Sequence, residues 1–167
     1  MDYKEFFVDL DIIKLKIFFD EKKNKILKTE IIDDNLRNFN KSKNFISESI
    51  KKYFYGDIDK FDLSLINFDE MRNFQKDTLI KLSEIPRGKV ITYKGLAESV
   101  GKEKAYRAVG TSLARNPFPI IIPCHRVIKS NLDVGNFGKR MDLKIKLLKF
   151  EGIIFQNDNF ISKEFVL

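Results

Sequence analysis

The segment TYKGLAESVGKEKAYRAVGTSLARNP, residues 92–117, decides the fold expected for the second half of the chain. Thr92 is a residue type that caps helices, so we expect a short helix over Tyr93–Val100 that stops at Gly101. A second helix is predicted from about Glu103 to Arg115, and Asn116-Pro117 ends it. Two short helices joined by a glycine-containing turn are typical of a helix-turn-helix.

The second of these predicted helices carries small residues beside basic ones. Ala105, Ala108 and Gly110 would let its backbone come close to something bulky, and Lys104 and Arg107 lie among them. Tight packing against another helix explains small residues, and a duplex groove explains small and basic residues together. Both interpretations stay open from the sequence.

The rest of the chain predicts a mixed α+β protein with a boundary near residue 70. Alternating apolar residues predict two strands, Ile13–Phe19 and Ile26–Ile32, joined as a hairpin. Helical spacing of apolar residues predicts a helix over Lys41–Phe54, with Gly56 as its stop. A second helix is predicted from Met71 to Ile85 and ends at Pro86-Arg87-Gly88. The segment between them, Asp57–Asp69, is predicted to be a strand or a connector. We therefore expect a scaffold domain over 1–70 and a second domain over 71–167.

Composition excludes several classes of protein. The chain has 167 residues, of which 43% are hydrophobic and 33% charged, and no apolar run long enough to span a bilayer. Its acid-containing N-terminus is unlike a signal peptide, and one cysteine cannot form an internal disulfide, so we expect a cytoplasmic protein. Cys124 and His125 are the single cysteine and the single histidine, which excludes Cys/His zinc clusters.

Positive charge is concentrated in the second half. Residues 1–84 carry 16 Lys/Arg against 17 Asp/Glu, whereas residues 85–152 carry 14 against 5, a net charge of +9. This asymmetry is compatible with a solubilising surface and with contact to a polyanion.

The stretch IIIPCHRVI, residues 120–128, surrounds the cysteine with apolar residues. A cysteine in such a setting is often buried and inert. A preceding proline, a following histidine and arginine, and the basic surroundings favour a reactive thiol with a pKa below its ordinary value of about 8.5. Because neighbours on an extended chain point in opposite directions, contact between Cys124 and His125 requires a turn or a bridging water.

A long run of motifs resembles the O6-alkylguanine-DNA alkyltransferases, also called methylated-DNA–protein-cysteine methyltransferases. The resemblance spans roughly residues 74–152, with its elements in family order. It rests on these segments: Ile85-Pro86-Arg87-Gly88-Lys89-Val90, Thr92-Tyr93, Arg107-Ala108-Val109-Gly110, Asn116-Pro117, Pro123-Cys124-His125-Arg126-Val127-Ile128, Gly135-Asn136-Phe137-Gly138, Lys144, Leu147-Leu148 and Glu151-Gly152.

The resemblance implies repair of O6-alkylguanine by irreversible alkyl transfer to Cys124, once per molecule. His125 would take the thiol proton through water, Glu151 would orient the imidazole, and Asn116 would hold the turn behind the cysteine. Tyr93 would donate a proton or hydrogen bond to the departing guanine. The substrate pocket would comprise Tyr93, Pro123, Val127, Phe137 and Gly138.

The resemblance also implies double-stranded DNA as the partner and a flipped target base. Arg107 would fill the gap left by that base, and the helix would lie in the minor groove. The DNA contacts would come from Lys104, Ala105, Tyr106, Arg107, Arg115 and Ser130. The implied fold is a small ribonuclease H-like α/β domain with an antiparallel sheet, followed by a mainly helical winged helix-turn-helix domain. No cofactor, metal or membrane contact is implied, and we expect a monomer.

Four positions depart from the family pattern. Phe137 stands where a tyrosine is common, Lys139-Arg140 replace glycine or small residues, and Tyr106 replaces a small residue. These changes affect the shape of the substrate loop and the fit to the groove.

Three other functions compete with alkyl transfer. A non-enzymatic lesion binder of the alkyltransferase-like kind would lack the acceptor cysteine. A winged-helix regulator would bind a specific duplex sequence and show no lesion preference. A cysteine hydrolase would require a histidine elsewhere, whereas the single histidine is adjacent to the cysteine.

Overall fold

The computed structural model describes residues 3–32, 43–138 and 140–167, and it divides into two compact units. The first unit comprises Met1–Met71 together with Pro117–Ile121, and the second comprises Arg72–Asn116 and Ile122–Leu167. The return of residues 117–121 to the first unit is not anticipated by a single boundary near residue 70. Within the described residues, no helix combines the length and apolar character needed to cross a membrane.

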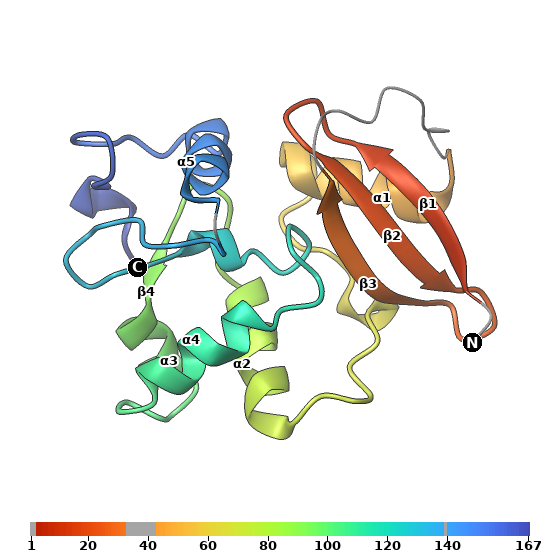
Figure 1. Ribbon diagram of the computed structural model, residues 1–167, viewed down its shortest axis with the longest axis horizontal. Coiled ribbons are helices and arrows are strands. Elements are labelled where there is room, and N and C mark those ends of the chain that lie inside the picture. Colours follow the sequence, from red (N-terminus) through yellow and green to blue (C-terminus); the bar gives the residue numbers. More distant parts are fainter. Residues whose placement is uncertain (1–2, 33–42, 139) are drawn as a thin grey trace. The chain divides into compact units, whose positions relative to one another are not determined.

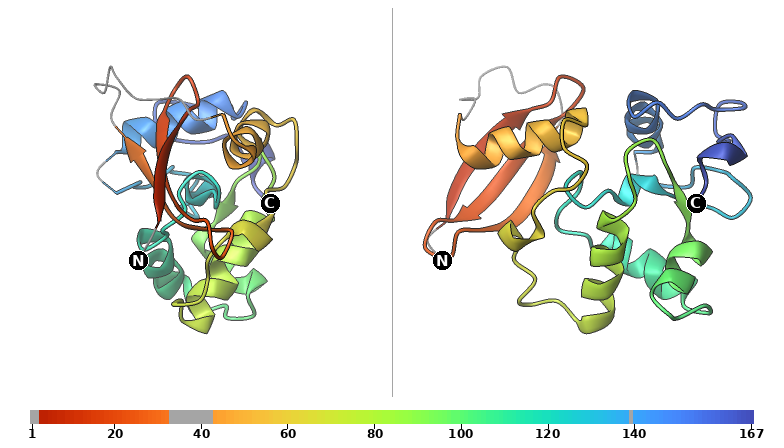
Figure 2. Two further views of the ribbon diagram at one scale, coloured as in Figure 1. Left: turned by 90° about the vertical axis from the view of Figure 1, so that its right-hand side faces the viewer. Right: turned by 180° about the vertical axis from the view of Figure 1, so that it is seen from behind.

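An antiparallel sheet of order β1-β2-β3 forms the body of the first unit. The hairpin of β2 (Lys14–Asp20) and β3 (Lys25–Ile32) confirms the sequence prediction. The sequence analysis missed β1 (Lys4–Asp9), where adjacent Phe6 and Phe7 obscure the alternation. Helix α1 (Phe45–Tyr55) lies against one face of this sheet, as Figure 2 shows from behind.

The ends of α1 follow from local chemistry. The Asn44 side chain accepts from the Ser47 backbone N–H and the Ser47 hydroxyl accepts from the Asn44 backbone, a reciprocal capping box. Gly56 ends the helix at φ 87°, as expected. The segment 57–69 is a connector that contains one short 3₁₀ turn, η1 (Leu63–Leu65), so the strand interpretation was wrong. Lys41 and Ser42, at the expected start of the helix, lie outside the described residues.

Three helices pack together in the second unit (Figure 1). They are α2 (Asn73–Ser83), α3 (Tyr93–Ser99) and α4 (Tyr106–Ala114). Thr92 caps α3 by accepting from the Gly95 N–H, as predicted. Helix α4 is shorter than expected because backbone bonds from Gly101 to Glu98, Lys102 to Ala97 and Ala105 to Lys102 hold residues 101–105 in tight turns.

The remaining elements of the second unit surround a small apolar core. Strand β4 (Ile91–Thr92) pairs in parallel with β5 (Val127–Ile128), and α5 (Met141–Phe150) packs near the turn η2 (Cys124–Arg126). The C-terminal segment contains η3 (Lys163–Phe165). The core comprises Val90, Ile128, Val134, Leu148, Ile153 and Ile161, so that the last 15 residues complete it.

Candidate active site

Cys124 opens a 3₁₀ turn immediately before β5. Pro123 precedes it, and the Arg126 N–H donates to the Pro123 carbonyl at 2.9 Å. From the sequence, contact between Cys124 and His125 requires a turn or a bridging water, and η2 is such a turn. Cys124 keeps a partly exposed surface, whereas His125 is 1% exposed. Cys124 is therefore the more accessible residue of the pair.

Asn116 braces this turn from the end of α4. Its Nδ2 donates to the Ile122 carbonyl at 2.9 Å and to Cys124 Sγ at 3.2 Å. A donor aimed at sulfur favours the thiolate over the thiol. Asn116 thus fixes the backbone before the cysteine and contacts the reactive atom itself.

Glu151 sets the tautomer of His125. The charges and hydrogen bonds of His125 and Arg126 lower the pKa of Glu151 to about 2, although burial acts to raise this pKa. The ionised carboxylate can only accept, so His125 Nε2, 2.8 Å from Oε1, carries the proton that it donates. Nδ1 is left with a lone pair, and this buried atom has no partner among the described residues. A basic nitrogen thus lies in the turn that carries the thiol.

Burial determines the protonation of both reactive groups. It lowers the pKa of His125, against the opposing effect of Glu151, so the imidazole is neutral near pH 7. Burial also raises the pKa of the Cys124 thiol, although the Asn116 hydrogen bond and Lys144 oppose it. The expectation of a lowered thiol pKa was therefore wrong for the resting protein. The thiol is protonated near pH 7 and requires a base.

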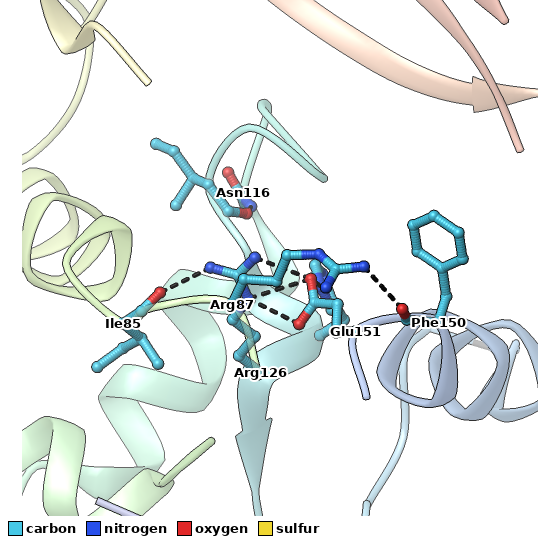
Figure 3. Close-up of polar contacts among 8 residues, drawn as sticks. Ile85, Arg87, Asn116, Arg126, Phe150 and Glu151 are labelled. Carbon is cyan, nitrogen blue, oxygen red and sulfur yellow. Dashed lines mark hydrogen bonds and ion pairs between the residues drawn. The ribbon is translucent and has the colours of Figure 1, made fainter. Parts of the chain in front are cut away.

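Two buried cations, Arg126 and Lys144, hold this arrangement; from the sequence, Arg126 was expected only to favour a reactive thiol, and Lys144 had no assigned role. Arg126 donates from Nε and Nη2 to the Glu151 carboxylate, at 2.9 Å to Oε2 and 2.8 Å to Oε1 (Figure 3). Lys144, on α5, donates from Nζ to the carbonyls of Val127 and Val134. Burial lowers the pKa of Lys144 to about 8, although Cys124 acts to raise it. Both positions belong to the family motifs, but the partners that each buried charge needs could not be predicted without knowing which residues the fold buries.

The residues expected to line the substrate pocket have different environments. Tyr93 begins α3 and is partly buried; burial raises its pKa, and the charge of Cys124 adds to this effect. The Phe137 ring meets the His125 imidazole edge-on, with centroids 6.4 Å apart and planes at 85°. Pro123 and Val127 are buried, and Gly138 is exposed at φ 58°. Lys139, a noted departure from the family, lies outside the described residues.

Most residues expected to contact DNA are exposed. Lys104, Tyr106, Arg107, Arg115 and Ser130 are exposed, and Ala105 is partly exposed. Lys104 and Ala105 precede α4 and Arg115 follows it, so only Tyr106 and Arg107 of this set lie within the helix. The Arg107 guanidinium lies over the Tyr106 ring at 5.8 Å.

Packing inside the unit does not require two small residues of α4, Gly110 and Ala108. A Cβ at Gly110 would lie 3.9 Å from the Tyr93 ring, which is an ordinary van der Waals contact. Ala108 is exposed. No group of three metal-binding side chains occurs among residues 3–32, 43–138 and 140–167.

Comparison with known proteins identifies the family. Residues 73–153 match the DNA-binding domain of 6-O-methylguanine DNA methyltransferase. A methylated-DNA–protein-cysteine methyltransferase of Methanosarcina barkeri is 45% identical over 66% of this chain and 70% of its own length. A mimivirus protein, named as a probable methylated-DNA–protein-cysteine methyltransferase of Acanthamoeba polyphaga mimivirus, is 35% identical over 86% of this chain and 93% of its own length.

Solved structures agree with these relatives. The Mycobacterium tuberculosis OGT in complex with DNA superposes with a TM-score of 0.70 and 25% identity, covering 88% of this chain and 91% of that one. The S. pombe Atl1 in complex with damaged DNA containing O6-carboxymethylguanine covers 58% of this chain and 98% of its own, with a TM-score of 0.52 and 25% identity. With relatives matched over most of their length, the chain belongs to the methylated-DNA–protein-cysteine methyltransferase family.

Proposed function

We propose that this protein repairs DNA by transferring the alkyl group of O6-alkylguanine to Cys124, irreversibly and once per molecule. The observation that carries the proposal is the presence, in one turn, of a partly exposed cysteine residue and a buried histidine whose Nδ1 lone pair is unengaged within the described residues. Membership of the methyltransferase family supports the substrate class.

The proton of the thiol has a defined destination in this proposal. His125 Nδ1 accepts it through a bridging water, and the imidazolium that forms is stabilised by the Glu151 carboxylate on the opposite nitrogen. Asn116 stabilises the charge that develops on Sγ, because it already donates to this atom. These three side chains explain how a thiol of raised pKa becomes a nucleophile near pH 7.

The transfer step forms one bond and breaks one bond, and guanine is the leaving group. The Sγ–carbon bond forms as the carbon–O6 bond breaks, giving a thioether and a guanine anion. The Tyr93 hydroxyl protonates or hydrogen-bonds this anion, and its raised pKa keeps it in the donor form. The His125 imidazolium then returns its proton through solvent to Tyr93, or to the guanine anion where Tyr93 only hydrogen-bonds it, so the net movement is one proton from the thiol to the guanine. Because the carbon–sulfur bond of the thioether resists displacement of the thiolate, the cysteine is not regenerated.

We further propose how the lesion reaches the thiol. Exposed Tyr106 and Arg107 on α4 favour a helix that enters the minor groove while Arg107 occupies the place of the flipped base. Helices α3 and α4, with the 129–138 loop as a wing, would form a winged helix-turn-helix over 71–167. The first 70 residues would be a ribonuclease H-like scaffold, and the protein would act as a monomer on double-stranded DNA.

Stoichiometry tests the proposed function. A duplex containing O6-methylguanine is incubated in tenfold excess over the protein, and the remaining lesion is counted. One lesion should disappear per protein molecule, after which the reaction should stop. Continued turnover would show a catalyst that regenerates itself, and no loss of lesion from a folded sample would show a binding protein.

A further inference from the structure

The C-terminal end of α5 requires one side-chain donor. An α-helix leaves its last four carbonyls without partners inside the helix, and here these belong to residues 147–150. Backbone N–H groups satisfy the first three of them. Glu151 N–H donates to the Leu147 carbonyl, Ile153 N–H to the Leu148 carbonyl, and Gly152 N–H to the Lys149 carbonyl. The last carbonyl, that of Phe150, accepts instead from Arg87 Nη2 at 2.7 Å.

Arg87 belongs to a turn that contacts this helix end at further points. Its guanidinium lies over the Phe150 ring at 5.2 Å (Figure 3). Gly88, at φ 78°, approaches so closely that an added Cβ would lie 3.4 Å from the Glu151 carbonyl oxygen. Arg126 also donates from Nη1 to the Ile85 carbonyl at 2.6 Å. The turn 85–88 therefore holds both the end of α5 and the arginine that binds Glu151.

We propose that Arg87 is a positioning residue for alkyl transfer, which completes the C-terminal cap of α5 and so holds Glu151 against His125. Glu151 is the first residue beyond the helix, so fraying of the last turn would displace its carboxylate directly. A cation at this end also interacts favourably with the helix dipole. The inference rests on the proposed function, in which Glu151 stabilises the His125 imidazolium.

Lys89 provides a matched control in the same turn. Its Nζ donates to the Glu164 carbonyl at 2.9 Å, so its side-chain hydrogen bond goes to the C-terminal segment and not to α5. Arg87→Met and Lys89→Met each remove one positive charge from residues 85–89. A general effect of lost charge should therefore appear in both variants, whereas loss of the α5 cap should appear only in Arg87→Met.

The single histidine of the chain makes the test direct, because its ring protons give one NMR titration. The charged groups that act on His125 are Glu151, Arg126 and Lys144, and neither variant changes them. Without Arg87, a displaced Glu151 stabilises the imidazolium less, so the pKa of His125 should fall by roughly 0.5. Transfer from free O6-benzylguanine, which needs no DNA binding, should slow about 10- to 100-fold.

Arg87→Lys should recover most of both properties, because an ammonium can still donate to the Phe150 carbonyl. Lys89→Met should match the wild type. If Arg87→Met does not fold, Arg87→Gln, which keeps an N–H donor but no charge, is measured in its place and should show a smaller shift in the same direction. An unchanged pKa and rate would overturn the inference, and so would a rise in the pKa, which would mean that Arg87 acts on His125 only as a charge. A wild-type protein that does not react with O6-benzylguanine or with lesion DNA would overturn the proposed function itself.

Discussion

Cys124 and His125 are neighbours in one turn, yet their environments differ. Cys124 is partly exposed as a residue, although its thiol is desolvated, and the imidazole of His125 is enclosed with its Nε2 on Glu151. Burial disfavours the charged form of each, so the resting pair is a neutral thiol beside a neutral imidazole. A base that is neutral at physiological pH is ready to accept the thiol proton.

His125→Ala should slow methyl transfer by roughly 10²- to 10⁴-fold at pH 7, as expected for loss of a general base. The pH profile should change as well. In the wild type the rate should rise as His125 loses its proton, through a midpoint below 6.5, because burial lowers this pKa. In His125→Ala that rise should vanish and activity should appear only at alkaline pH, where the thiol itself ionises.

The rate of single-turnover transfer from free O6-benzylguanine between pH 5 and 10 measures both the rise at acid pH and the rise at alkaline pH. If His125→Ala kept the rise at acid pH that the wild type shows, the role of His125 as base would be contradicted.

The motif identified Cys124, His125 and Glu151 from the sequence, but it did not predict the direction of the shift in the thiol pKa. That direction depends on how deeply the fold buries the sulfur, and residue type alone does not determine burial.

Helix α4 is the element on which the DNA proposal depends. Its exposed side includes Tyr106, Arg107 and Ala108, whereas Val109 and Leu113 are buried. The stop at Asn116-Pro117 and the turn at Gly101 predicted a helix between them, which is α4. The three-residue error at its N-terminus arose because residues 101–105 form consecutive tight turns, which local sequence preferences do not distinguish from a first helical turn.

Arg107→Ala should slow repair of duplex DNA far more than reaction with free O6-benzylguanine. Flipping a base costs a few kcal/mol of stacking and pairing, and a side chain that fills the gap offsets part of this cost. The free base needs no flipping, so its rate should be nearly unchanged. Equal losses on the two substrates would mean that Arg107 supports the fold or the thiol instead.

Lys104→Ala should weaken binding of undamaged and damaged duplexes alike. Lys104 is exposed in the turn before α4, where it is suited to a phosphate contact. Each phosphate contact contributes about −0.9 to the slope of log affinity against log salt, so this slope should flatten by about one. A change in lesion preference with an unchanged slope would contradict this assignment.

Across the whole molecule, chemistry and scaffold are divided between the two units. Every residue of the proposed relay belongs to the second unit, and the net charge of +9 over residues 85–152 lies in the same part of the sequence. The sequence predicts a boundary near residue 70 because charge, motif and apolar pattern all change there. It did not anticipate that residues 117–121 group with the first unit, since this depends on contacts between distant segments, such as the Thr29 N–H with the Pro117 carbonyl.

The free energy of unfolding should fall in two steps as the pH is lowered. Unfolded His125 takes up a proton near 6.5, whereas the folded protein does so only at lower pH. In the unfolded chain the Glu151 carboxylate takes up a proton near pH 4.5, whereas in the folded protein it stays ionised down to about pH 2. In both steps the unfolded state binds more protons, so stability is lost as the pH falls. Urea titrations between pH 3 and 8 measure this, and His125→Gln should remove the upper step. A pH-independent stability in this range would contradict the buried relay.

The central claim is that Cys124 accepts the alkyl group, and mass spectrometry tests it most directly. After incubation with a duplex that contains O6-methylguanine, the intact protein should gain about 14 Da, the mass of one methyl replacing one proton on sulfur. Peptide mapping should locate the added mass on the peptide that contains Cys124, and Cys124→Ser should gain none while still binding the lesion. An unchanged mass in a folded sample, or a methyl group on any other residue, would contradict the account.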